Sequence, residues 1–409
     1  PFSTGSLERS LSGSAPMSSP SSGPASGRCP PRSEAELQRR QRQGSLQVRS
    51  AAAYRDLVRR EGLAEAYLRT DVVVAANAEF TDQASLLLLL GPCDPPIRIR
   101  RFRLGACEGL GGHGSSELLL PIGLGGAGVL DDLLAGLSLP LSASGMGTAQ
   151  QPRLELESRL SLASIGAGRL LLHRAVAENG VVAVSSREGL TASPWGPLLG
   201  RLSSALYSSG GAGSIGLTMP GLSLLGPGSP VMVAGALGWV SGAGSGHHPQ
   251  ARRQASGHAL SPGACAAVDV ELHSLQRRWL RPTRQPDGGS GLLVAIAAPV
   301  PLINGTIARQ AACNDNDLEA PVLDFAIPRR VRPCLGNATY SALKSGQLLL
   351  NEHRLTCAPA HSPRLAAEIS DHLVEALQAG RFPLRLPLQP LPERAALVPL
   401  GDGSTENQP

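Results

Sequence analysis

The sequence DVVVAANAEFTDQASLLLLLGPCDPPI, residues 71–97, holds the strongest structural signals in the chain. Three valines at positions 72–74 predict a buried strand, and Asn77 predicts the start of a loop after it. Five consecutive leucines at positions 86–90 end at a Gly-Pro pair. Such a run is typical of a core strand or a buried helix segment, and the pattern alone does not separate the two.

This stretch closes with the turn Cys93-Asp94-Pro95-Pro96. Each proline fixes its own φ and pushes the preceding residue toward extended geometry, so we expect Cys93 and Asp94 to be held in place. A fixed thiol and a fixed carboxylate at the end of a buried element can form the wall of a site. Asp before Pro is also ordinary turn chemistry, so both interpretations stay open.

The composition is that of a globular protein with few aromatic residues. Of the 409 residues 42% are hydrophobic but only 3% aromatic, so the core must be built from Leu, Ala and Val. Glycine (48) and proline (34) predict many turns. We predict an α/β fold, a mixed sheet with short helices and many Gly/Pro loops, over residues 33–392. Residues 1–32 are expected to be disordered and residues 393–409 to form a loose tail.

Charge and cysteine usage exclude several classes of partner. A net charge of +5 spread along the chain, with few aromatic residues, argues against nucleic-acid binding. Seven scattered cysteines without a CxxC pair predict no metal site and indicate a reducing cytoplasm. No apolar run reaches the ~18 residues of a membrane span, and the N-terminus does not look like a secretory signal. No cofactor is expected, and the oligomeric state is not determined.

Local patterns predict several further elements. Ser33 and Glu36 have the spacing of a capping box, and Ser362-Pro363 opens a helix that ends before Gly380. Residues 231–240 predict a pair of strands broken by glycine. Residues 293–297 predict a core strand, followed by a stiff extended loop at 299–304.

Three polar patterns could each form a ligand-binding site. The arginine-rich strand at 98–103 can meet a substrate carboxylate or simply face solvent. Asp315 and Asp317 can hold a substrate ammonium group or act as turn formers. The GxGxxG at 211–216 lacks the following helix and acidic residue of a dinucleotide site, so we reject that function.

Two further residues are site candidates. His247, in a His-His-Pro loop, can shuttle protons during addition to a carbonyl, or it can be a loop tip without a role. Asn304 ends the proline-stiffened loop, where α/β sheets present ligand groups, and is the expected polar contact there.

The chain resembles the homocysteine biosynthesis (L-aspartate semialdehyde sulfurtransferase) family. The resemblance runs in order from about residue 33 to residue 392. Its main segments are residues 77–97, 126–136, 141–153, 233–249, 296–325 and 339–392.

This resemblance implies a cytoplasmic transferase of sulfur metabolism and methionine biosynthesis. It converts aspartate semialdehyde and a reduced sulfur donor to homocysteine through an enzyme persulfide, and a separate protein supplies the sulfur or the reducing equivalents. The candidate substrate-binding residues are Asn77, Asp94, Thr148, Arg153 and Asn304. The resemblance places a catalytic histidine at His247, and Cys93 is a second catalytic candidate because it lies in a family-matched turn near Arg98 and Arg100.

The expected sulfur carrier is replaced in this chain. The family pattern G-T-x-C-Y-P-R corresponds to residues 147–153, where Gln150 stands at the cysteine position. A second family cysteine falls near Asp82. An amide cannot form a persulfide, so Cys93 becomes the candidate carrier. The alternative function is that of a non-catalytic relative, a metabolite- or partner-binding module.

Overall fold

The computed structural model describes residues 29–395 and 397, apart from residues 113, 115, 285–288 and 330. The expected disordered segment 1–32 lies outside the described residues up to position 28, and so does most of the expected tail 393–409. The described part is an α/β structure with mixed sheets, short helices and many loops, so the predicted fold class is confirmed.

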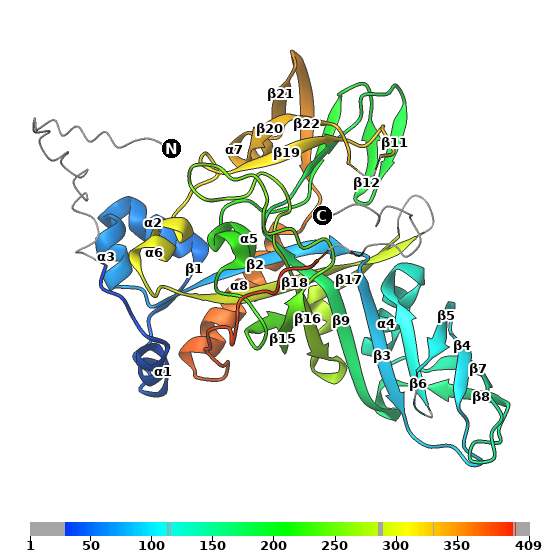
Figure 1. Ribbon diagram of the computed structural model, residues 1–409. Helices are drawn as coiled ribbons and strands as arrows, with labels where there is room; N and C mark the ends of the chain where they lie inside the picture. Colours follow the sequence, from blue (N-terminus) through cyan, green and yellow to red (C-terminus); the bar gives the residue numbers. More distant parts are fainter. Residues whose placement is uncertain are drawn as a thin grey trace, which may run out of the picture.

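Fourteen of the described strands form one large mixed sheet (Figure 1). Thirteen of them follow one another across the sheet, and β17 (Leu280–Arg284) pairs with β18 off this path. The order is β1 (Val48–Ser50), β2 (Val72–Thr81), β18 (Ser290–Pro301), β14 (Pro230–Val233), β15 (Ala236–Ala243), β16 (Cys265–Glu271), β9 (Ile165–Ala177), β3 (Ala84–Leu90), β6 (Glu117–Pro121), β5 (Cys107–Gly111), β4 (Ile99–Leu104), β7 (Leu139–Gly145) and β8 (Glu155–Leu160). The leucine run is therefore a strand, β3.

The strand that begins with three valines does not end at Asn77, so the predicted loop there is wrong. β2 continues to Thr81 because β18 pairs with it antiparallel over its whole length, from Val72 opposite Pro301 to Thr81 opposite Leu292. Side chains two apart in a strand lie on the same face. Asn77 and Glu79 therefore point to the same side of the sheet.

The predicted loop at 299–304 is also partly strand, because β18 extends to Pro301. Leu302 donates its N–H to the Asp71 carbonyl oxygen. Backbone N–H groups alternate in direction along a strand, so at positions 299 and 301 they would point away from β2. Pro299 and Pro301, which have no N–H group, therefore cost no hydrogen bond to β2. β14 pairs with β18 only up to Ala297, so no neighbour there requires those donors.

A smaller six-stranded sheet lies over one part of the large sheet (Figure 1). Its order is β20 (Cys334–Thr339), β19 (Glu319–Asp324), β10 (Val182–Val184), β13 (Ser204–Tyr207), β22 (His353–Pro359) and β21 (Gln347–Leu350). It has a separate apolar core built around Val322, Tyr340 and Leu355. The hairpin β11 (Leu190–Ser193) and β12 (Gly196–Leu199) stands beside this sheet.

The helices are short, and most begin at the caps that the sequence shows. They are α1 (Glu34–Arg42), α2 (Ala51–Glu61), α3 (Leu63–Leu68), α4 (Gly126–Leu134), α5 (Ile215–Thr218), α6 (Gly305–Ala311), α7 (Tyr340–Lys344) and α8 (Pro363–Gln378). Ser33 caps α1 and Ser362 caps α8, as predicted. α8 packs its apolar face on β1, β2 and β18. Among the described helices none is long and apolar enough to cross a membrane.

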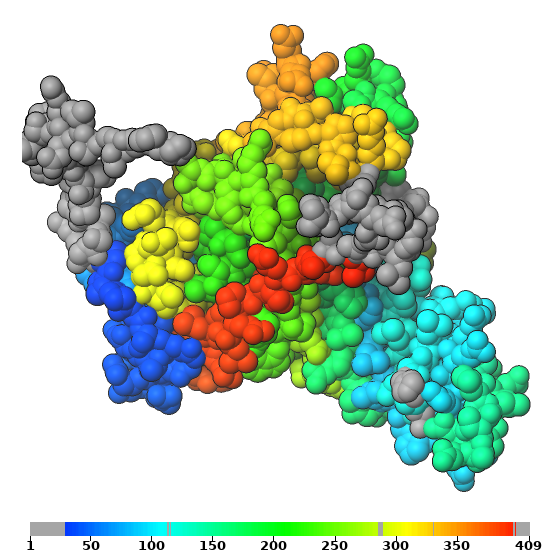
Figure 2. Space-filling model, in the orientation of Figure 1, coloured from blue at the N-terminus to red at the C-terminus, as the bar shows by residue number. Residues whose placement is uncertain are grey.

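The outer strands of the large sheet form an arm. β4 to β8 curl away from the rest of the molecule and project to the lower right in Figure 2. β3 leads into this arm, and the Cys93–Pro96 turn connects β3 to β4. α4 packs where the arm meets β17 and β18.

Asp71, at the start of β2, ties the N-terminal elements to the sheet. Its side chain is 1% exposed and accepts hydrogen bonds from Arg40 Nη1 (2.7 Å) and from the Gln47 backbone N–H (2.9 Å). Arg32 Nη1 lies 3.7 Å away. One buried carboxylate thus joins α1, β1 and β2.

We expect Asp71→Ala to lower the free energy of unfolding by about 2–3 kcal/mol, because it leaves Arg32 without a carboxylate, Arg40 with Glu36 alone and the Gln47 N–H without its acceptor. Asp56, whose pair with Arg59 is largely exposed, is the matched control, and Asp56→Ala should cost less than ~0.5 kcal/mol. Urea unfolding midpoints measure both. Equal losses in the two variants would show that Asp71 has no special structural role.

Candidate functional site

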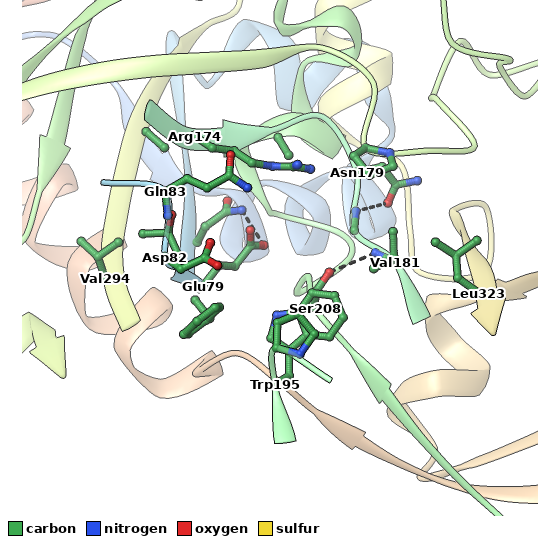
Figure 3. A pocket seen from close by; sticks show the side chains of 18 of the residues that line it. Glu79, Asp82, Gln83, Arg174, Asn179, Val181, Trp195, Ser208, Val294 and Leu323 are labelled. Carbon is green, nitrogen blue, oxygen red and sulfur yellow. Dashed lines mark hydrogen bonds between the residues drawn. The ribbon is translucent and has the colours of Figure 1, made fainter. Parts of the chain in front are cut away.

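A cavity of about 340 Å³ lies between the large and the small sheet (Figure 3). The large sheet contributes the ends of β2 and β9 and the middle of β18, and the small sheet contributes the ends of β10, β13 and β19. Glu79, Asp82, Gln83 and Arg174 lie together on one side of the cavity, and Asn179, Val181, Ser208 and Trp195 on the other.

Glu79 is the acid at the centre of the polar side. Asn77 Nδ2 donates to its Oε1 at 2.7 Å. Burial between the sheets raises the pKa of Glu79 from 4.5 to about 7, although hydrogen bonds from Ser209 and Asn77 and the charge of Arg174 act in the opposite direction. A carboxyl group with this pKa can both donate and accept a proton near neutral pH.

Asn77 is held so that its amide faces Glu79. Its Oδ1 accepts the backbone N–H of Ile215, the first residue of α5, at 2.7 Å. The amide nitrogen is therefore the end that remains to donate to Glu79. Asn77 also lines the cavity, so its predicted contact with a substrate stays a prediction, and its amide in addition positions Glu79.

A buried polar network continues from Glu79 into the small sheet. Ser209 hydrogen-bonds with Glu79 and with Tyr340. The Tyr340 hydroxyl donates to Asn179 Oδ1 at 2.7 Å, and Asn179 Nδ2 donates to the carbonyl oxygens of Ala259 and Glu319. This network fixes the two sheets relative to each other on one side of the cavity.

Arg174 supplies positive charge to the cavity. It stands on β9, and its charge favours the ionised form of Glu79. Within the part of the chain that the structure describes, the Arg174 side chain makes no ion pair or hydrogen bond. Its guanidinium group is therefore available to an anionic ligand.

The predicted residues Asp94 and Arg153 do meet, but at the far end of β3 from the cavity. Arg153 Nη2 donates to the Asp94 carbonyl oxygen (2.6 Å) and Nε to that of Pro95 (2.9 Å). The half-buried Cys93 is in the same turn, and its thiol donates to the Pro95 carbonyl oxygen at 3.4 Å. β3 rises ~3.3 Å per residue, so this turn lies on the order of 20 Å from Gln83.

Thr148 and Gln150 belong to the loop between β7 and β8, which meets that same turn. The Thr148 hydroxyl accepts the backbone N–H of Gln151, which closes a local turn, and Gln150 is exposed. Cys93, Asp94, Thr148 and Arg153 are thus brought together, on the arm and away from Glu79.

His247 and Asn304 do not line the cavity. His247 Nδ1 lies 3.0 Å from the backbone nitrogen and 3.1 Å from the carbonyl oxygen of Cys265, and its Nε2 is buried without a hydrogen-bond partner among the described residues. Asn304 caps α6, accepting from the backbone N–H groups of Thr306 and Ile307. α6 lies at the opposite side of the molecule from β7 and β8 (Figure 1). From the sequence we also predicted that the loops around Asn77, Asp94, Thr148, His247 and Asn304 meet in one cleft, and the structure does not bring them all together.

The thiols differ in how burial affects them. Burial raises the pKa of Cys107 and Cys357 to about 11 and also raises those of Cys265 and Cys313, which disfavours their thiolates. No cysteine is among the described residues that line the cavity. Nor do three His, Cys, Asp or Glu side chains of the described chain gather in a way that would hold a metal ion.

Sequence reasoning missed Glu79, Arg174 and the small-sheet wall. The one signal for Glu79 was its position two residues after Asn77. In a strand this spacing puts both side chains on the same face, so Glu79 becomes a candidate once residues 77–81 are known to be a strand. Arg174 lies nearly a hundred residues further on, on a strand that the patterns did not predict as a cavity wall.

A polar cavity between two sheets, with a carboxyl and a guanidinium group on one side, has the geometry of a small-molecule site. Residues 47–384 match the model of a family described as homocysteine biosynthesis enzyme, sulfur-incorporation. The chain belongs to this family.

Two relatives carry the name L-aspartate semialdehyde sulfurtransferase. The protein from Methanocaldococcus jannaschii is 27% identical over 373 residues, which cover 85% of this chain and 70% of the relative. The protein from Methanosarcina acetivorans is also 27% identical, over 369 residues, covering 88% of this chain and 72% of the relative. No solved structure matches the chain significantly.

The raised pKa of Glu79 links its proton to folding. Because the folded pKa of about 7 exceeds the ordinary 4.5, the folded state keeps a proton that the unfolded state has lost between these values. The free energy of unfolding therefore falls as pH rises from about 4.5 to about 7, by on the order of 3 kcal/mol.

We expect Glu79→Gln to remove this pH dependence, since glutamine does not titrate. Between pH 4 and pH 8 its free energy of unfolding should therefore fall less than that of wild type. Urea midpoints measured from pH 4 to pH 8 test this. Glu65→Gln, at an exposed glutamate, should leave the wild-type curve unchanged. Parallel curves for wild type and Glu79→Gln would contradict the raised pKa.

Proposed function

We propose that this chain incorporates sulfur into an amino-acid aldehyde, aspartate semialdehyde, to give homocysteine, and that the aldehyde binds in the cavity between the two sheets. Membership of the sulfur-incorporation family and the name of the two relatives support this substrate. The observation that carries the assignment to the cavity is Glu79, a carboxyl group whose pKa of about 7 suits proton transfer.

The proposed chemical step is addition of a sulfur nucleophile to the aldehyde carbon. The sulfur lone pair forms the C–S bond, the π electrons of the carbonyl move to oxygen, and that oxygen takes the proton of the Glu79 carboxyl group. With hydrosulfide, HS⁻, as the nucleophile, the product is a carbon that carries one hydroxyl and one thiol group, and the negative charge of the nucleophile ends on the Glu79 carboxylate. The Glu79 carboxylate is then beside Arg174, whose charge stabilises it.

To become the thiol of homocysteine, this adduct must lose water and then be reduced by two electrons and two protons. These electrons must come from a reductant. The cavity contributes binding, orientation and the proton.

If this proposal is right, Glu79→Gln lowers kcat for homocysteine formation about 100-fold, because the amide cannot transfer the proton. The assay contains purified protein, aspartate semialdehyde, sulfide and a chemical reductant, with homocysteine quantified by mass spectrometry. Glu65→Gln should keep wild-type turnover. Full activity in Glu79→Gln would place the chemistry outside the cavity.

The turn on the arm is the other place where the chemistry can occur. There Cys93 is the candidate sulfur carrier and Asp94, Thr148 and Arg153 are the candidate substrate contacts. Its separation from the cavity by the length of β3 makes the two sites alternatives within one chain.

Substitution of single cysteines separates these sites. If Cys93 carries the sulfur, Cys93→Ser abolishes homocysteine formation and persulfide labelling at that position, since a hydroxyl group cannot hold the transferred sulfur. Cys334→Ser, at an exposed thiol, is the matched control and should retain both. Unchanged turnover in Cys93→Ser would remove Cys93 from the mechanism.

The non-catalytic function is favoured by one observation, that Gln150 stands where the family pattern has cysteine and no described cysteine lines the cavity. Under this alternative the wild type binds an amino acid but forms no homocysteine, and fails to restore growth of a homocysteine auxotroph. Recovery of turnover in Gln150→Cys would then identify the lost carrier position.

A further inference from the structure

The small-sheet wall of the cavity carries a stack of two aromatic rings and a guanidinium group. Trp195, between β11 and β12, and Phe325, directly after β19, meet edge to face with their ring centroids 5.6 Å apart. The guanidinium carbon of Arg332 lies 4.1 Å from the centroid of the Phe325 ring. All three side chains line the cavity.

This stack holds Arg332 in place without neutralising it. Phe325 is fixed because its backbone N–H donates to the Val184 carbonyl oxygen at 2.9 Å. A guanidinium group over an aromatic face is attracted by the ring and loses mobility. Arg332 is therefore ordered before any ligand arrives.

Arg332 lacks a carboxylate partner among the residues that the structure describes. Its Nε is buried and makes no hydrogen bond there. Asp324, the nearest acid along this segment, uses its oxygens to accept from Ser186 and from the backbone N–H of Ala326. A buried N–H without an acceptor costs ~1–3 kcal/mol. Arg332 lines the cavity, so an anionic ligand there meets its unpaired guanidinium charge, although not the fully buried Nε.

The two arginines of the cavity are not equivalent. Arg174 stands on the large sheet, and its charge acts on Glu79. Arg332 stands on the small sheet, without a described acidic partner. A substrate that brings its own carboxylate fits Arg332, while its carbonyl end faces Glu79 on the opposite sheet.

We propose that Arg332 is the specificity-determining residue of this site and holds the carboxylate of the substrate. This inference rests on the proposed function. It makes the cavity selective for aldehydes that carry a carboxylate, because an uncharged aldehyde would leave the guanidinium group desolvated and unpaired. Binding also bridges the two sheets, since the carboxylate is held by one and the reacting carbon lies beside the other.

The test compares Arg332→Met with Arg329→Met, an exposed arginine three residues earlier in the same segment. Methionine keeps apolar contact with Phe325 and removes the charge. Calorimetric titration with L-homoserine, the non-reacting alcohol analogue of the aldehyde, should show at least tenfold weaker binding in Arg332→Met and a change below twofold in Arg329→Met. Arg332→Lys, which keeps the charge but not the fork of donors, should lie between them.

A kinetic comparison gives the second readout. The ratio of kcat/KM for aspartate semialdehyde to that for butyraldehyde should fall at least tenfold in Arg332→Met and change less than twofold in Arg329→Met, and wild-type urea midpoints show that both variants are folded. Wild-type affinity for L-homoserine in Arg332→Met would overturn the role of Arg332 and leave the proposed function standing. A wild type that neither binds L-homoserine nor forms homocysteine would overturn both.

Discussion

The antiparallel pairing of β2 with β18 is the constraint on which the rest of the structure depends. It keeps β2 extended from Val72 to Thr81 and so holds Asn77 and Glu79 on one face. It gives α8 a flat apolar surface to cover, and it leads the chain at Asp82 into β3 and the arm. If β2 ended at Asn77, Glu79 would sit in a solvated loop, where burial could not raise its pKa.

The second consequence of this pairing is a cavity shared by two sheets. Neither sheet forms a site alone: the large sheet supplies Glu79 and Arg174, and the small sheet supplies the Trp195–Phe325–Arg332 stack. The network from Glu79 through Ser209 and Tyr340 to Asn179 fixes the position of one sheet relative to the other. Desolvated charged groups are costly unless they are paired or bind a ligand. Arg174 and Arg332, which have no ion-pair partner among the described residues, are therefore the most informative residues of the cavity.

The arm presents a different problem of function. Its turn keeps the residues through which the chain most resembles its family, and Arg153 fastens that turn through two backbone carbonyl groups. These contacts stabilise the turn. The Cys93 thiol and the Arg153 guanidinium group donate to the same Pro95 carbonyl oxygen. Family resemblance drew attention to this turn, whereas the electrostatics of the buried groups draw attention to the cavity. The two lines of evidence thus point to different ends of β3.

The sequence by itself determined the elements with strong local signals. Ser33 and Ser362 mark the starts of α1 and α8 because their side chains cap the first turn, and the glycine-broken run at 231–240 predicted the strand pair that the structure has as β14 and β15. It also determined family membership, since collinear segments need no coordinates. Asn77 and the prolines 299 and 301 led to wrong predictions of loops, because these residue types are uncommon inside strands. Pairing with a distant strand overrode that propensity, since sheet hydrogen bonds depend on partners far away in the chain. The tertiary structure alone decided the site. Glu79, Arg174 and Arg332 are spread over some 250 residues of the sequence, and only the packing of one sheet over the other brings them into one cavity and raises the pKa of Glu79.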